Sequence, residues 1–118
     1  MAKQQGSTRE RSRVFTNYPK HYKVLFHNDD FTPMDFVVML LVDVFYKSSS
    51  EAKRLMLQVH EEGVAVVGIY SYDMAVSMVS RATTISRDEG FPLRITYEPE
   101  WAGIDNEYKA FFISLSLN

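Results

Sequence analysis

The sequence of 118 residues contains no cysteine, which excludes a disulfide scaffold, a thiolate zinc site and a cysteine nucleophile. No apolar run approaches the roughly 18–20 residues that a membrane-spanning helix needs. The start of the chain is polar and charged, whereas a signal peptide would be apolar there. We therefore expect a soluble, cytoplasmic protein that does not enter a membrane.

Glycine is also scarce, and its distribution excludes two common catalytic motifs. The 5 glycines are scattered, so the sequence has no glycine-rich phosphate loop, and it has no Gly-x-Ser-x-Gly nucleophile elbow. The 3 histidines, His21, His27 and His60, do not have the spacing of metal ligands. The sequence therefore predicts no metal, no cofactor and no catalytic residue.

Basic residues are concentrated at the start of the chain. Residues 1–20 contain five basic side chains and one acidic side chain, so the remainder is more acidic than the net charge of -2 suggests. A nucleic-acid-binding domain would be expected to carry its basic residues on the folded face, so we expect no nucleic-acid partner. Because residues 1–18 also lack hydrophobic periodicity, we interpret them as a flexible basic N-terminal extension.

The rest of the chain has the composition of one globular domain, with 46% hydrophobic and 24% charged residues overall. Alternating and β-branched stretches predict strands, and capping residues before apolar positions at helical spacing predict helices. The predicted elements are a strand over 22–27, a helix over 34–46 that starts at Thr32-Pro33, a helix from Ser48 to Gly63, a strand over 64–70, a helix from Ser71 that ends before Gly90, and a strand over 93–98. At the start of the first helix, Thr32 can act as the cap and Pro33 suits the first helical position. This β-α-α-β-α-β order predicts the α+β class, with helices covering one face of a small sheet.

The second and third predicted helices each have an apolar stripe that we expect to face the core. In the second helix the stripe consists of Ala52, Leu55, Met56, Val59 and His60. In the third helix it consists of Ala75, Met78, Val79, Ala82 and Ile85.

Three features could carry chemistry, and each has a purely structural alternative. Asn28, Asp29 and Asp30 either form a turn or offer oxygen acceptors to a cationic donor such as an ammonium group. His60 is either a core histidine or a ligand-binding residue at the border of a pocket. The 6 methionines either fill the core or line an adaptable apolar pocket.

Residues 99–118 form a C-terminal extension, after a core over 19–98, to which we assign no role. Within it, Ile113–Leu117 alternates in the manner of a strand but follows a polar linker. This stretch could add a strand to the sheet, pack over the surface or remain loose.

Three blocks of the sequence carry a resemblance. The first block runs from Tyr22 to Val38 and includes Asn28-Asp29-Asp30-Phe31-Thr32-Pro33-Met34. The second block is Leu55-Met56-Leu57-Gln58-Val59-His60, followed by Gly63. The third block is Glu89-Gly90-Phe91-Pro92-Leu93. In their order and spacing these blocks resemble ClpS, the adaptor of the Clp protease. The resemblance covers about residues 19–98.

The resemblance implies a three-stranded antiparallel sheet packed with three helices, a fold shared with the C-terminal domain of the ribosomal stalk protein. It implies an adaptor rather than an enzyme. Such an adaptor binds N-degron substrates, which begin with Leu, Phe, Tyr or Trp, and delivers them to a hexameric Clp AAA+ ATPase for degradation. We expect a monomer, with the N-terminal extension engaged by the ATPase during delivery.

The resemblance also implies roles for individual residues. The α-amino group of the substrate would be bound by Asn28, Asp30 and His60, with Asp29 adjacent. The side-chain pocket would consist of Thr32, Met34, Val37, Met56, Val59 and Leu93, and Met34 at its rim would exclude β-branched first residues. Asp73 and Met78 would dock the ATPase, although the family often has a lysine in place of Met78 and an acid in place of Val76.

Two other functions remain open. A stalk-like domain that contacts translation factors would use the same fold without an amine pocket. A small hydrolase could use Asp29, Asp30 and His60, but no nucleophile accompanies them. The adaptor hypothesis requires Asn28, Asp30 and His60 to converge beside an apolar hollow.

Overall fold

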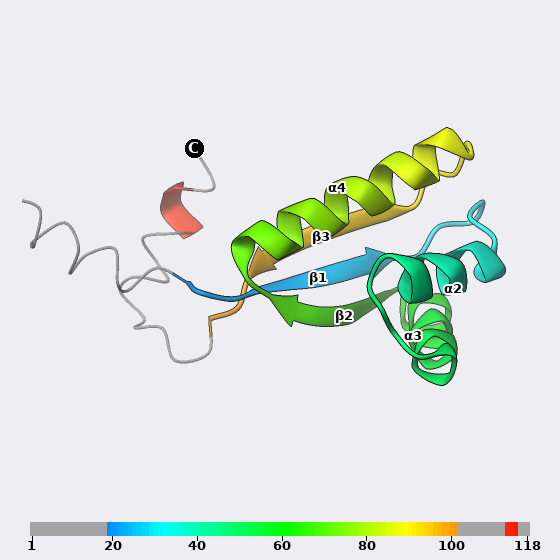
Figure 1. Ribbon diagram of the computed structural model, residues 1–118, viewed down its shortest axis with the longest axis horizontal. Helices are drawn as coiled ribbons and strands as arrows, with labels where there is room; N and C mark the ends of the chain where they lie inside the picture. Colours follow the sequence, from blue (N-terminus) through cyan, green and yellow to red (C-terminus); the bar gives the residue numbers. More distant parts are fainter. Residues whose placement is uncertain (1–18, 102–112, 116–118) are drawn as a thin grey trace, which may run out of the picture. The chain divides into compact units, whose positions relative to one another are not determined.

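The computed structural model describes residues 19–101 and 113–115, and within it His21–Pro99 form one compact unit. The elements of this unit are β1 (Tyr22–His27), α2 (Met34–Asp43), α3 (Ser49–Glu62), β2 (Val64–Tyr70), α4 (Tyr72–Asp88) and β3 (Arg94–Pro99) (Figure 1). The predicted order and the α+β class are therefore confirmed.

The two predicted extensions lie mostly outside the residues that the structure describes. This holds for residues 1–18 and for most of residues 99–118. Of the alternating stretch Ile113–Leu117, residues 113–115 are helical and exposed, so they do not form the strand that was one alternative.

The sheet is antiparallel, with the strand order β2-β1-β3. Alternate side chains of the three strands are buried on one face, namely Val24, Phe26, Ala65, Val67 and Ile95. On the opposite face the side chains are half-buried or exposed, as Val66 illustrates. Because successive side chains of a strand point to opposite faces, the helices must cover the first of these faces.

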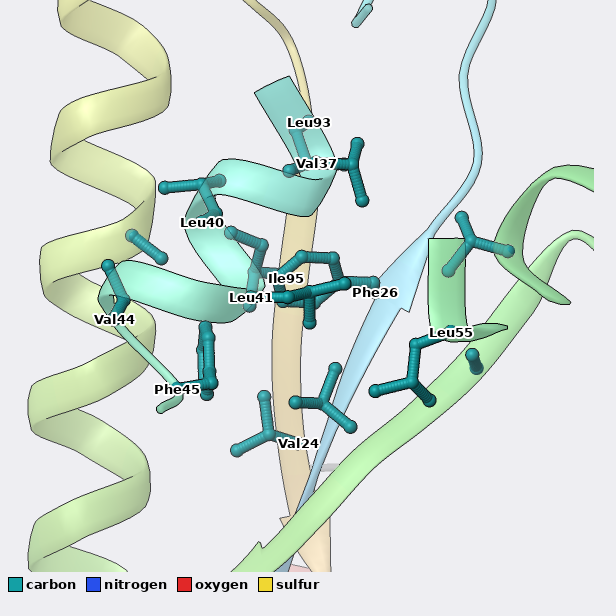
Figure 2. Close-up of a cluster of buried hydrophobic side chains, with 14 of the residues drawn as sticks. Val24, Phe26, Val37, Leu40, Leu41, Val44, Phe45, Leu55, Leu93 and Ile95 are labelled. Carbon is teal, nitrogen blue, oxygen red and sulfur yellow. The ribbon is translucent and has the colours of Figure 1, made fainter. Parts of the chain in front are cut away.

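The three helices cover different parts of this face. In Figure 1, α4 runs along the sheet beside β3, whereas α2 and α3 lie near the end of β1. Figure 2 shows Leu41 and Phe45 close to Phe26 of β1. The rings of Phe26 and Phe45 meet edge to face with centroids 5.4 Å apart. The core therefore extends to the end of β1, where the candidate site begins.

The ends of α3 and the start of α4 follow the predicted capping chemistry. The Ser48 hydroxyl accepts a hydrogen bond from the Glu51 N–H at 3.2 Å, and the Ser71 hydroxyl accepts one from the Met74 N–H at 3.3 Å. Gly63 ends α3 with a φ of 89°, a left-handed conformation that glycine adopts without a steric penalty.

The helix α2 is shorter than predicted. It ends at Asp43, whereas the prediction extended it to Tyr46. Tyr46 has a φ of 56°, and the N–H of Lys47 donates to the Leu41 carbonyl at 3.0 Å. The chain thus leaves the helical path between Val44 and Lys47. The apolar run continues through Val44 and Phe45 because both are buried under the sheet, not because the helix continues.

His27 lies on the uncovered face of the sheet, with Nε2 2.7 Å from Oγ1 of Thr96 on β3. Partial burial lowers the pKa of His27, the Arg94 guanidinium lowers it further, and Glu98 opposes them. The pKa of imidazole in an unfolded chain is about 6.5, so the unfolded chain binds more protons than the folded chain just below that pH. The contribution of His27 to stability is therefore fully present above about pH 6.5 and is lost as the pH falls through the folded-state pKa.

We expect acidification from about pH 7.5 to about pH 5 to lower the thermal unfolding midpoint more in the wild type than in His27→Gln. The glutamine does not titrate and keeps a polar atom near Thr96. Differential scanning fluorimetry of both proteins at several pH values measures this difference. Equal decreases in the two proteins would show that His27 does not titrate differently on folding.

Candidate functional site

A cavity of about 380 Å³ opens at the end of β1. Its lining comes from the loop that leaves β1, from the first turn of α2 and from the second half of α3. The lining residues are Asn28, Asp29, Asp30, Phe31, Thr32, Pro33, Met34, Val37, Met56, Val59 and His60. Segments about 30 residues apart in the sequence thus meet around one hollow.

The loop is held by the carboxylate of Asp29. Its Oδ1 accepts hydrogen bonds from the N–H groups of Phe31 at 2.8 Å and Thr32 at 2.7 Å, and its Oδ2 accepts one from the Thr32 hydroxyl at 2.8 Å. Burial raises the pKa of Asp29, but the hydrogen bonds from Thr32 and Phe31, aided by the Arg87 charge, outweigh it and leave this pKa below its ordinary value. Asp29 is therefore a charged acceptor around which the loop folds.

The start of α2 differs from the prediction that Thr32 caps the helix and that Pro33 is its first residue. The helix begins at Met34, and the flanking residue is Pro33, whose backbone is extended with a ψ of 145°. The ring of Pro33 carries no acceptor that could cap this end, and Thr32 lies one residue earlier, with its hydroxyl donating to Asp29. Within the first turn, Asp35 Oδ1 accepts a hydrogen bond from the Phe36 N–H at 2.9 Å. The Pro33 carbonyl accepts the first helical hydrogen bond, from the Val37 N–H at 3.2 Å.

One backbone hydrogen bond brings the loop to α3. The Asn28 N–H donates to the Gly63 carbonyl at 2.8 Å, at the residue where α3 ends. His60 lies three residues earlier on α3, and its side chain lines the cavity. Asn28, Asp30 and His60 are all exposed. All three line the same cavity as the apolar residues described next.

The apolar part of the cavity has a buried floor and an exposed rim. Val37 and Val59 are almost completely buried in the core, and Met56 is half-buried beside them. Met34 is 42% exposed at the first turn of α2. The predicted apolar pocket residues Thr32, Met34, Val37, Met56 and Val59 are thus brought together.

Leu93 is the exception among the predicted pocket residues. It does not line the cavity but lies in the core with 1% of its surface exposed, and Figure 2 draws it within the cluster of buried hydrophobic side chains. Its carbonyl and that of Phe91 accept hydrogen bonds from Arg87 Nη1, at 2.9 and 2.8 Å. These two hydrogen bonds tie the backbone of the segment to α4.

Two residues that sequence reasoning did not assign also line the cavity, Phe31 and Pro33. Both occur inside the Asn-Asp-Asp-Phe-Thr-Pro motif, between residues that were assigned. Their position between two assigned groups was the available signal.

The two predicted docking residues on α4 have different environments. Asp73 is exposed in the first turn of the helix, next to Tyr72, which is also exposed. Met78 is 7% exposed and belongs to the core, so its side chain is not available to a partner and its assignment to docking is corrected. A lysine would reach solvent from that position, but the apolar methionine packs inward.

The described residues show neither a metal cluster nor a membrane span. In residues 19–101 and 113–115, no group of three or more histidine, aspartate or glutamate side chains could hold a metal ion. None of the helices in this part of the chain is both long and apolar enough to cross a bilayer.

The chemistry of the cavity is that of a receptor for a small amphipathic group. Carboxylate, amide and imidazole acceptors suit a cationic donor, and the adjoining apolar floor suits an apolar side chain.

A family model described as "ATP-dependent Clp protease adaptor protein ClpS" matches residues 17–96. The chain belongs to the ClpS family. The resemblance carried by the three sequence blocks is thereby confirmed.

Individual ClpS proteins are similar to this chain over most of their own length. The ATP-dependent Clp protease adapter protein ClpS of Oleidesulfovibrio alaskensis is 43% identical over 102 residues, which is 83% of this chain and 98% of that protein. The ClpS of Acetivibrio thermocellus is 48% identical over 82 residues, or 70% of this chain and 83% of that protein. A solved structure of Agrobacterium tumefaciens ClpS2 bound to L-phenylalaninamide is similar with a TM-score of 0.67 and 42% identity, covering 70% of this chain and 100% of that one.

Proposed function

We propose that this protein binds polypeptides by a bulky apolar first residue, Leu, Phe, Tyr or Trp, and delivers them to a Clp AAA+ ATPase. The observation that carries the proposal is the cavity, in which exposed polar acceptors adjoin a buried apolar floor. The relative from Agrobacterium tumefaciens supports it, because that protein is bound to L-phenylalaninamide. This ligand combines a free amine, an aromatic side chain and an amide at the point where a polypeptide would continue.

The amine is recognised by Asn28, Asp30 and His60. A free α-amino group has a pKa of about 7.7–8.0, so near neutral pH it is largely charged and offers up to three N–H donors. The Asn28 amide oxygen and the Asp30 carboxylate accept two of them, and a neutral His60 ring accepts another through its unprotonated nitrogen. An acetylated amine would leave these acceptors unpaired, so the site rejects it.

The side chain of the first residue fills the apolar part of the cavity, and its burial contributes roughly 1.5–3 kcal/mol. Met34 at the rim excludes β-branched first residues, which are wide close to the backbone. Asp29 contributes indirectly, because its oxygens hold the loop that presents Asn28 and Asp30.

In delivery the protein acts as a monomeric, cytoplasmic adaptor and not as a catalyst. Its proposed partner is the hexameric AAA+ ATPase of the Clp protease, and the relatives from two bacteria are named as adapters of the ATP-dependent Clp protease. The exposed start of α4, with Asp73 and Tyr72, is the surface that we propose for docking.

Fluorescence anisotropy of labelled peptides that differ only in their first residue tests the proposal. The set consists of Phe, Leu and Ala peptides and of a Phe peptide with an acetylated amine. We expect the Phe and Leu peptides to bind at least about tenfold more tightly than the Ala and acetyl-Phe peptides, since each of the latter loses at least about 1.4 kcal/mol. Equal binding of all four peptides, or of none, would contradict the proposal and favour the stalk-like alternative.

A further inference from the structure

Phe31 has the largest exposed fraction, 78%, among the large hydrophobic side chains of the described residues. It lines the cavity at its rim together with Pro33 and Met34, which are also exposed. An aromatic ring with so little burial contributes little to the core. Among the described residues the ring is left uncovered, and a ligand that leaves the cavity over this rim would bury part of it.

The backbone at Phe31 is held in place although its ring is exposed. The Phe31 N–H donates to Asp29 Oδ1 at 2.8 Å, and the next N–H, of Thr32, donates to the same oxygen at 2.7 Å. A rigid aromatic side chain on a constrained loop loses little conformational entropy when a ligand covers it. The loop thus presents the ring in a form ready for contact.

The geometry of the proposed first-residue site determines what lies next to this ring. Phe31 follows Asp30, which binds the amine, and precedes Thr32, which lines the pocket. When the first residue occupies the cavity, its carbonyl must leave through the mouth, and the next Cα lies only about 3.8 Å from the first. The second residue of the polypeptide is therefore at the rim.

We propose that Phe31, with Pro33, forms a second subsite that contacts the side chain of the second residue and favours an apolar one. The inference rests on the proposed function, because the first residue must be seated before the second can be placed. L-phenylalaninamide, the ligand in the relative's structure, ends at the amide and so has no second side chain.

The test is fluorescence anisotropy with two peptides, Phe-Leu and Phe-Gly at their N-termini, that are otherwise identical. We expect the wild type to bind the Phe-Leu peptide about fivefold more tightly, since the leucine covers part of the exposed ring. Phe31→Ser should reduce this preference to less than about twofold, whatever change it causes in the affinity for Phe-Gly. Phe31→Tyr should keep the preference, because it keeps the ring.

Leu57→Ser is the matched control, since Leu57 is 47% exposed on α3 and does not line the cavity. It should retain the preference for Phe-Leu, and both serine variants should unfold at the wild-type temperature. Equal binding of the two peptides by the wild type, or an equal loss of both in Phe31→Ser, would overturn the subsite and leave first-residue recognition intact. Failure of the wild type to bind either peptide would overturn the proposed function and the subsite with it.

Discussion

Replacement of His60 by alanine is expected to weaken binding of a peptide with a free N-terminal phenylalanine by about tenfold to a hundredfold. The imidazole is one of three acceptor groups at the proposed amine site, and a hydrogen bond to a charged group contributes about 1.5–3 kcal/mol. The same substitution should change the free energy of unfolding by no more than about 0.5 kcal/mol, because His60 is exposed on α3. Peptide anisotropy and urea unfolding of the same preparations measure the two effects.

Glu61→Ala is the control for this prediction, since Glu61 is an exposed neighbour on α3 that does not line the cavity. It should leave both the affinity and the stability close to wild type. If His60→Ala lowers stability as much as affinity, His60 is a structural residue, and the amine must be bound by Asn28 and Asp30 without it.

Local chemistry explains which parts of the fold could be predicted from the sequence. The caps at Ser48, Gly63 and Ser71 depend on residues within one turn of the helix, and all three are observed. At the start of α2 the flanking residue is Pro33 and not Thr32, whose N–H and hydroxyl both donate to Asp29. The capping preference of threonine could not reveal that Asp29 draws Thr32 into the preceding loop.

Non-local features were harder to predict. The strand order β2-β1-β3 results from pairing between segments up to about 75 residues apart, and no local pattern encodes it. Helical periodicity correctly placed Met78 on the buried face of α4, while its position in the family motif suggested docking. The helical periodicity gave the correct position, because it depends on the apolar methionine that this chain has, whereas the family often has a lysine there.

In the candidate site, too, the local motifs could be predicted from the sequence, but the contacts between distant segments could not. The motif around Asn28 and the stripe with His60 could be recognised separately, but the bond between Asn28 and the carbonyl of Gly63 is what joins them. Leu93 was expected in the pocket and lies in the core, with 1% of its surface exposed. Burial depth of this kind depends on three-dimensional packing and cannot be obtained from spacing.

Asp29→Ala is expected to affect binding and stability together, in contrast to His60→Ala. The substitution removes the acceptor of three hydrogen bonds and leaves the N–H groups of Phe31 and Thr32 without their partner. We expect a loss of about 1–3 kcal/mol in the free energy of unfolding. We also expect at least about a tenfold loss in affinity for a free-amine Phe peptide, because the loop no longer holds Asn28 and Asp30 in place.

Three further variants separate the role of Asp29 from a general effect of charge. Asp29→Asn keeps an oxygen acceptor and should lie between the wild type and Asp29→Ala in both measurements. Asp43→Ala removes an exposed carboxylate at the far end of α2 and should leave both nearly unchanged. Asp30→Ala should lower affinity without lowering stability, since Asp30 is exposed. If Asp29→Ala instead behaves like Asp30→Ala, with full stability and weakened binding, the Asp29 carboxylate contacts the ligand directly, and its three hydrogen bonds are not what shapes the loop.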